Sequence, residues 1–199
     1  MLRVATLLAL VILAIGGCTG TMGGAADDGG GPDASAPDAA PPGDFVAVAR
    51  GMEWVSAKVP YCQAANHAHD ADTACSSTCT RPDVPAWDPY RSDCSGFLSW
   101  AWGLPAPGRT TMTLAPYDHT VSHAIDAAEL QPGDAINNDH HTMLLAEWLV
   151  PGTKARFLEE PGCSTTQPYA REFIATVTLT GQMVMVTNRG AYTAIRRDP

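Results

Sequence analysis

The chain has 199 residues and a formal net charge of −9, with 21 acidic side chains against 12 basic ones. Hydrophobic residues make up 45% of it, which is enough to bury the core of about one domain. The surplus of negative charge offers no attraction to polyanions, and this excludes nucleic acid and an anionic membrane surface as charge-driven partners.

The chain begins with a segment that has the anatomy of an export signal. Arg3 precedes an apolar run from Val4 to Ile15, and two glycines then lead to Cys18. The run is too short to span a bilayer as a final anchor. Residues 1–17 resemble the signal peptide of a bacterial lipoprotein, which implies cleavage before Cys18 and a lipid on its thiol; a plain secretory signal is the alternative.

The next segment, residues 18–44, is predicted to be a flexible tether that follows the lipidated cysteine. From Thr19 to Asp44 it consists almost entirely of Gly, Ala, Pro, Ser, Thr and Asp, so it cannot bury a core. Its five aspartates leave a net charge of about −5 on the predicted domain, residues 45–199. Thr19 is not the aspartate associated with inner-membrane retention of lipoproteins. That resemblance implies a lipid anchor in the outer membrane, with the domain facing the periplasm.

The domain is expected to open with a helix from about Val46 to Lys58, followed by Val59-Pro60-Tyr61 and a cysteine-rich stretch at about residues 62–92. With Cys18 lipidated and Cys94 set apart, an even number of cysteines remains in an exported chain, which predicts two disulfides. The candidates are Cys62, Cys75, Cys79 and Cys163, and all three pairings are open.

A zinc site is the alternative for this stretch, because it crowds several ligand-type side chains together. Their spacing fits no regular zinc module and export favours oxidation, so we expect no metal and no cofactor. The side chains concerned are Cys62, His67, His69, Cys75 and Cys79.

The sequence Asp93-Cys94-Ser95-Gly96 places a cysteine where a helix is about to begin. The helix continues to Gly103, where Gly103-Leu104-Pro105 ends it. Unpaired N–H groups and the macrodipole favour negative charge at a helix N-terminus, so we expect the Cys94 thiol to ionise more easily than a free cysteine. This makes Cys94 a candidate nucleophile.

Strands are predicted to dominate the rest of the chain. After a long loop with a short helix at about 121–128, Leu130-Gln131-Pro132-Gly133-Asp134 forms a turn that leads into a strand. Short apolar or β-branched segments separated by Gly, Pro or Asn follow, which predicts an α+β fold with helices first and an antiparallel sheet afterwards. The predicted strands are His141–Leu149, Ala155–Glu160, Arg171–Leu179, Gln182–Thr187 and Tyr192–Arg197.

Two adjacent histidines, His140 and His141, open the first of these strands. A cysteine nucleophile needs a base, and because strand side chains alternate, only one of the two histidines can face the helix of Cys94. We predict His141 as the base, with His140 in the preceding turn. A carboxylate on the next strand can orient that base, and we predict Glu159, with Glu160 as the reserve.

These residues together resemble the NlpC-type cell-wall cysteine peptidases, which have a circularly permuted papain-like fold. The resemblance rests on the order and spacing of three features: Asp93-Cys94-Ser95-Gly96 before a helix, Leu130-Gln131-Pro132-Gly133-Asp134, and a histidine opening an apolar strand. It covers roughly Val46 to Arg197. It implies that the hydroxyl of Tyr61 and the backbone N–H of Cys94 stabilise an oxyanion, on a half-barrel packed against the helices.

The chain departs from the family in three respects. The inserted stretch separates Tyr61 from Cys94, and a glutamate stands where the family often has a histidine or another polar group. The strand after the histidine reads Thr142-Met143-Leu144, where the family usually has a small residue first. The resemblance implies a hydrolase that cuts an amide bond of peptidoglycan stem peptides by a Cys-His-Glu mechanism. The alternatives are an amidase or acyltransferase with the same chemistry, and a non-catalytic envelope lipoprotein that binds wall peptides or a protein partner. The sequence does not predict the oligomeric state.

Overall fold

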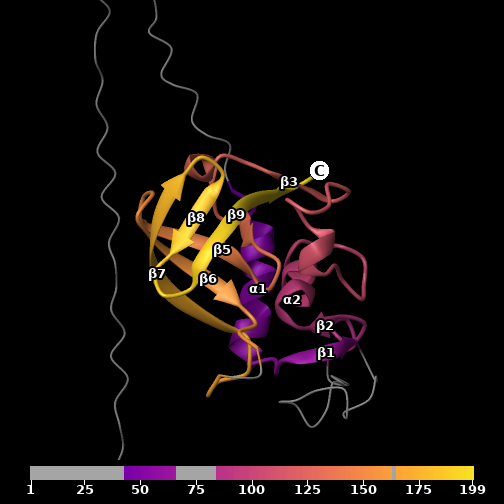
Figure 1. Ribbon diagram of the computed structural model, residues 1–199. Helices are drawn as coiled ribbons and strands as arrows, with labels where there is room; N and C mark the ends of the chain where they lie inside the picture. The colour runs from indigo at the N-terminus through magenta and orange to yellow at the C-terminus, as the bar shows by residue number, and fades with distance from the viewer. Residues whose placement is uncertain (1–42, 66–83, 163–164) are drawn as a thin grey trace, which may run out of the picture. The chain divides into compact units, whose positions relative to one another are not determined.

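Two helices pack against the outside of an antiparallel β-barrel in the computed structural model (Figure 1), which describes residues 43–65, 84–162 and 165–199. The helices are α1 (Phe45–Ala57) and α2 (Cys94–Ala101). The strands are β1 (Cys62–Ala65), β2 (Arg91–Ser92), β3 (Ser122–Ala124), β4 (Ala135–Asn137), β5 (Thr142–Val150), β6 (Lys154–Glu159), β7 (Arg171–Thr180), β8 (Met183–Val186) and β9 (Gly190–Arg197). The predicted α+β class, with helices before the main sheet, is therefore confirmed.

Helix α1 begins and ends within one residue of its predicted bounds. Asp44 caps its start, where the Oδ1 atom accepts a hydrogen bond of 3.0 Å from the N–H of Ala47. At its end Lys58 adopts the left-handed conformation, with φ of 51°, and its N–H donates to the carbonyls of Trp54 and Val55. Neither helix in the described part of the chain has the length and hydropathy needed to cross a membrane.

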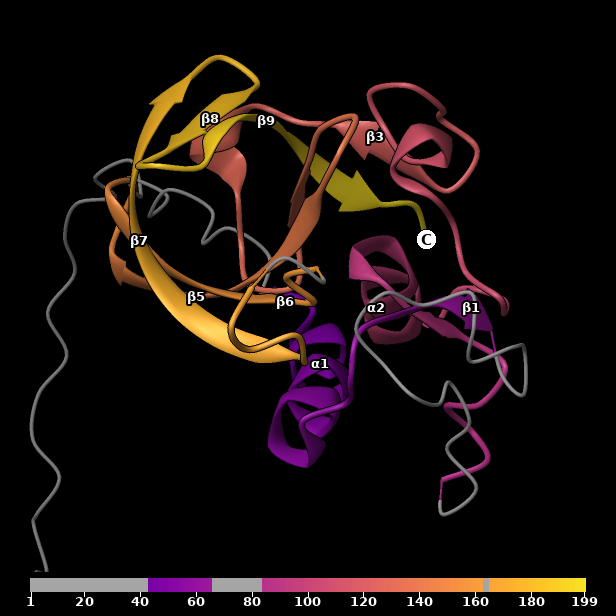
Figure 2. The same ribbon diagram turned by 60° about the horizontal axis from the view of Figure 1, so that its bottom comes forward.

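The main sheet closes on itself. Strands β4 to β9 pair in sequence order, and β9 pairs with both β8 and β4, so that six strands form a closed barrel, with β3 added along β9. Figure 2 shows this ring with α1 and α2 outside it. The predicted half-barrel is thus corrected, because the last strand meets both the first and the fifth strands of the ring.

Strand β5 shows how the alternation of side chains divides the core in two. Met143 and Leu145 belong to a cluster that receives side chains from all six barrel strands, and this cluster fills the barrel interior. Leu144, between them, belongs to the cluster that packs against the helices. The predicted strands from 141 to 197 agree with β5 to β9 to within two residues at each end.

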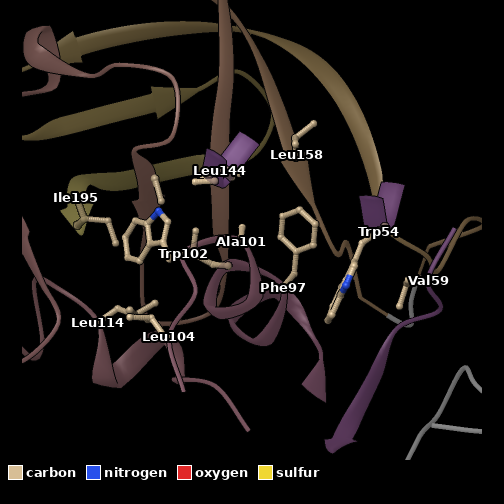
Figure 3. Close-up of a cluster of buried hydrophobic side chains, with 14 of the residues drawn as sticks. Trp54, Val59, Phe97, Ala101, Trp102, Leu104, Leu114, Leu144, Leu158 and Ile195 are labelled. Carbon is tan, nitrogen blue, oxygen red and sulfur yellow. The ribbon is translucent and has the colours of Figure 1, made fainter. Parts of the chain in front are cut away.

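The second cluster joins both helices to the outer face of the barrel. Figure 3 shows Phe97 of α2 directed toward Leu158 of the barrel. Trp54 of α1, Trp102 at the end of α2 and Leu144 of β5 belong to the same cluster. All five side chains are fully buried or nearly so. The first residue of α2, Cys94, is therefore held on a helix that the core fixes in place.

Two local predictions meet different outcomes. The short helix expected at about 121–128 is wrong, since Ser122–Ala124 is strand β3 and only Ala127–Glu129 forms a 3-10 turn. The turn at 130–134 is present. Its Asp134 is buried and accepts hydrogen bonds of 2.8 and 2.7 Å from Arg196 of β9, so this carboxylate ties the turn to the last strand.

Candidate active site

The N-terminus of α2 owes its position to Asp93 and Gly96. The Oδ1 atom of Asp93 accepts a hydrogen bond of 2.7 Å from the N–H of Gly96 and caps the helix, while Oδ2 accepts one of 3.0 Å from Nε of Arg91. A Cβ atom at Gly96 would collide with the carbonyl oxygen of Arg91. Asp93 and Gly96 are thus the residues that let Cys94 begin the helix close to β2.

The short β1–β2 pair brings Tyr61 close to the N-terminus of α2. Cys62 pairs with Ser92, and the hydroxyl of Ser92 donates a hydrogen bond of 2.6 Å to the carbonyl of Pro60. The cysteine-rich insertion therefore begins and ends on neighbouring strands, which keeps Tyr61 near Cys94. Burial, partly offset by a hydrogen bond from Gln63, raises the pKa of Tyr61 to about 12, and the charges of Cys94, Asp93 and Glu160 add to the rise.

The Cys94 thiol is buried, with 8% of the residue exposed. Backbone N–H groups of Cys94, Ser95 and Thr142 hydrogen-bond to it and lower its pKa, but burial and then the charge of Asp93 outweigh them and raise that pKa to about 12. The expectation that this thiol ionises easily is wrong for the protein without substrate. Loss of hydration destabilises the thiolate by more than the N–H groups at the helix N-terminus stabilise it.

His141 lies directly before Thr142, whose backbone N–H hydrogen-bonds to the Cys94 thiol. The side chain of Asn138 sets the turn before β5: its Oδ1 atom accepts the N–H groups of His140 and His141, at 3.0 and 2.8 Å. His140 is exposed and contacts Asp139. His141 is mostly buried, and its Nε2 atom lies 2.8 Å from Oε2 of Glu159.

Glu159 is fully buried at the end of β6 and meets three cationic or polar partners. His141 and Arg189 bind Oε2, at 2.8 and 2.6 Å, and Arg171 binds Oε1 through two nitrogens at 3.0 and 2.8 Å. Burial would raise the pKa of this carboxyl, but the hydrogen bonds and charges of His141 and Arg189 lower it to about 2. Glu159 is therefore an ionised acceptor at neutral pH, and Nε2 of His141 is the donor.

Glu160, the reserve candidate for the residue that orients His141, influences Tyr61 instead. It is fully buried, and its negative charge raises the pKa of Tyr61. The contact to His141 comes from Glu159.

The stability that Glu159 contributes is expected to disappear as the pH falls from about 5 to about 2. Its pKa lies near 2 in the folded chain against 4.5 ordinarily, so the folded state is favoured above pH 5 and loses this advantage as protons bind. The loss should be on the order of 3 kcal/mol. Urea unfolding at several pH values should show a flatter pH dependence in Glu159→Gln. Glu172→Gln, at an exposed carboxylate, is the control; equal slopes in Glu159→Gln and wild type would contradict the expectation.

Three residues around the site were not predicted from the sequence: Asn138, Arg171 and Arg189. Arg171 lies directly opposite Glu159 in the β6–β7 register, so pairing the two predicted strands would have suggested it. Asn138 stands three residues before His141, the spacing of a side chain that caps a turn. Arg189 lies in the β8–β9 turn, and no local pattern connects it to Glu159.

The other predictions about cysteines and metals concern residues of which only some lie in the described ranges. Cys94 is the only free cysteine of the described ranges, while the buried Cys62 is disulfide-bonded. Cys18, Cys75, Cys79 and Cys163, together with His67 and His69 of the zinc alternative, lie outside those ranges, so the pairing stays a prediction. Within the part of the chain that the structure describes, no three His, Cys, Asp or Glu side chains group as a metal site would require.

The arrangement has the parts of a thiol site. The buried thiol accepts the N–H of Thr142, the residue directly after His141. The Nε2 atom of His141 donates to an ionised carboxylate, which leaves Nδ1 to take a proton. Tyr61 and the backbone N–H of Cys94 supply two donors near the sulfur. In comparisons with known proteins, no family model, no curated protein and no solved structure matches the chain.

Proposed function

We propose that this protein is a cysteine hydrolase that cleaves an amide bond in the stem peptides of peptidoglycan. The observation that carries the proposal is that His141 pairs with a fully buried, ionised Glu159 and lies directly before Thr142, whose N–H binds the thiol at the start of α2. A buried carboxylate bound to an imidazole is the arrangement that orients a general base. The substrate class comes from the sequence resemblance to the NlpC-type peptidases.

The mechanism begins with a neutral thiol, because burial raises the pKa of Cys94 to about 12. As the sulfur bonds to the amide carbon, its proton moves to Nδ1 of His141, and Glu159 stabilises the cation that forms. The oxyanion accepts hydrogen bonds from the Cys94 N–H and the Tyr61 hydroxyl, which stays protonated at neutral pH. His141 then protonates the leaving amine as the C–N bond breaks, and water hydrolyses the thioester.

The same proposal includes a specific type of fold, a circularly permuted papain-like arrangement. The order along the chain, with Cys94 on a helix, His141 directly before β5 and Glu159 at the end of β6, supports this arrangement. By the same resemblance the preferred bond follows D-glutamate and precedes a diamino acid. An amidase that cuts between muramic acid and L-alanine, or an acyltransferase, would use the same chemistry.

We also propose that the domain works at a membrane through lipid on Cys18. Removal of residues 1–17 would leave the tether of residues 18–44 between the lipid and the catalytic domain. Such a tether lets the enzyme reach the wall from the periplasmic face of the outer membrane. The proposal rests on the signal-like sequence before Cys18.

The proposed activity can be tested by incubating purified sacculi with residues 41–199, which form one compact unit. The expected result is a set of new peptide fragments, whose masses in mass spectrometry identify the cleaved bond. Heat-denatured protein is the control. If a folded sample leaves the sacculi unchanged, peptidoglycan hydrolysis is the wrong function for this site.

Two features of Cys94 favour a second candidate, a lipoprotein that binds wall peptides or a protein partner without turnover. The residue is 8% exposed, and burial raises its pKa to about 12, so the thiol is shielded and protonated in the free protein. A binding protein would retain the thiol as a buried side chain only. Binding of stem peptides by calorimetry, without any fragment released, would support this candidate.

Alkylation of Cys94 by iodoacetamide is expected to be slow at pH 7 in the folded protein. The thiolate is the reactive form, and burial followed by the charge of Asp93 raises the pKa of this thiol to about 12. Mass spectrometry after a timed reaction should show an alkylation rate at least about tenfold below that of the same protein in urea, where the thiol regains an ordinary pKa. An equal or faster rate in the folded protein would contradict the raised pKa.

A further inference from the structure

The carboxylate of Glu159 has a different set of partners on each of its two oxygens. Oε1 accepts two hydrogen bonds from Arg171, at 3.0 and 2.8 Å, and Oε2 accepts one from Arg189 at 2.6 Å and one from His141 at 2.8 Å. The carboxylate itself is fully buried, whereas the arginine side chains are 24% and 28% exposed. Each oxygen is therefore occupied, and rotation of the carboxylate would break contacts on both sides.

Both arginines are themselves held in place. Arg171 lies directly opposite Glu159 in the antiparallel register of β6 and β7. Arg189 lies in the β8–β9 turn, and its guanidinium carbon stands 3.8 Å from the centre of the Phe173 ring. Phe173 in turn stacks on Phe157 of the barrel interior, with ring centres 5.7 Å apart. The position of Arg189 is thus fixed by the packed core and by the turn.

Two guanidinium groups exceed the charge of one carboxylate. A single partner would suffice to keep a buried carboxylate from standing alone, and here His141 already provides a hydrogen bond. A buried carboxylate without cations would take up a proton, and a protonated Glu159 would no longer hold the imidazole cation that forms during attack. The second cation therefore has a consequence for the proton transfer and not only for burial.

We propose that Arg171 and Arg189 are positioning residues of the candidate site. They keep Glu159 ionised with Oε2 turned to Nε2 of His141, so that Nδ1 is the nitrogen left to take the thiol proton. They act through Glu159. This inference rests on the proposed function and adds to it the part of the site that sets its lower pH limit.

Four charged or titratable side chains face Glu159 in the described part of the chain. They are His141 from the turn before β5, Arg171 from β7, Arg189 from the β8–β9 turn and Tyr192 from β9, whose pKa burial raises. Among them only the two arginines carry a permanent positive charge. Removing either one should let Glu159 protonate at a higher pH.

The test compares Arg171→Gln and Arg189→Gln with Arg156→Gln in the purified protein. Arg156 is the matched control, because it also lies on the barrel and pairs with two carboxylates, Glu147 and Glu172, but at the exposed surface away from Glu159. The first readout is the pH profile of kcat/KM on a stem peptide. The second is the ¹⁵N NMR signal of the His141 ring, which reports which nitrogen carries the hydrogen.

In the two site variants we expect kcat/KM to fall about 100-fold at neutral pH, as a displaced catalytic group would cause. The acid limb of the profile should move up by at least about one pH unit. The NMR signal should show the Nε2–H form in wild type and Arg156→Gln, and a mixture of both tautomers in the site variants. Arg171→Lys and Arg189→Lys, which keep the charge, should restore the acid limb if the glutamine variants fold poorly.

A pH profile and tautomer unchanged in both glutamine variants would overturn the inference, while wild-type activity would leave the proposed function intact. Failure of the proposed function can also be distinguished from failure of this inference. If wild type releases no peptide, the proposed function fails, and the NMR measurement alone then decides whether the arginines orient His141.

Discussion

Replacing Cys94 with alanine is expected to abolish the release of peptide fragments from peptidoglycan. The sulfur is the atom that would bond to the amide carbon, and no other cysteine of the described ranges is free to replace it. Removing the nucleophile of such a site lowers kcat by roughly 10⁴-fold or more, because the remaining groups cannot act without it. Quantitative mass spectrometry of muropeptides over a long incubation measures the loss.

His140→Ala is the matched control for this experiment. Its side chain is exposed beside the site and contacts Asp139, so the variant should retain at least half of the wild-type rate. His141→Ala, one position along, should lose about as much activity as Cys94→Ala, since the thiol and its base act as a unit. Undiminished fragment release by Cys94→Ala would rule out the cysteine mechanism.

Replacing Phe97 with alanine is expected to lower the free energy of unfolding by about 3–5 kcal/mol. Phe97 is fully buried in α2, packs edge-to-face on Trp54 of α1 with ring centres 5.9 Å apart, and belongs to the cluster that joins the helices to the barrel. Its removal would leave a cavity between three elements that cannot collapse independently. Urea denaturation followed by tryptophan fluorescence measures the change.

Phe45→Ala supplies the control for size and hydrophobicity. Phe45 is 62% exposed at the start of α1, so its loss should change the free energy of unfolding by no more than about 0.5 kcal/mol. A similar small effect at Phe97 would mean that α2 is not held by this cluster. The position of Cys94 would then need another explanation.

The sequence was sufficient to predict the elements whose signals are local. The helix from residue 46 and the strands from 141 onward follow from apolar periodicity and from Gly, Pro and Asn at the turns, and the structure confirms them. His141, and not its neighbour His140, binds Glu159 as predicted, although both lie in the turn before β5 that Asn138 sets. By contrast, β3 could not be predicted, because Ser122-His123-Ala124 has no strand pattern of its own and becomes a strand by pairing with β9.

The state of the candidate site depends on contacts between segments far apart in the sequence. Closure of the barrel by β9, and the approach of Arg189 to Glu159 across 30 positions, are set by strand pairing and by packing. The same holds for the Cys94 thiol: its place at a helix start predicts easier ionisation, but burial reverses the direction of the pKa shift. Local sequence determines which residues can take part in the site, whereas hydration and charge there depend on what the folded chain places around them.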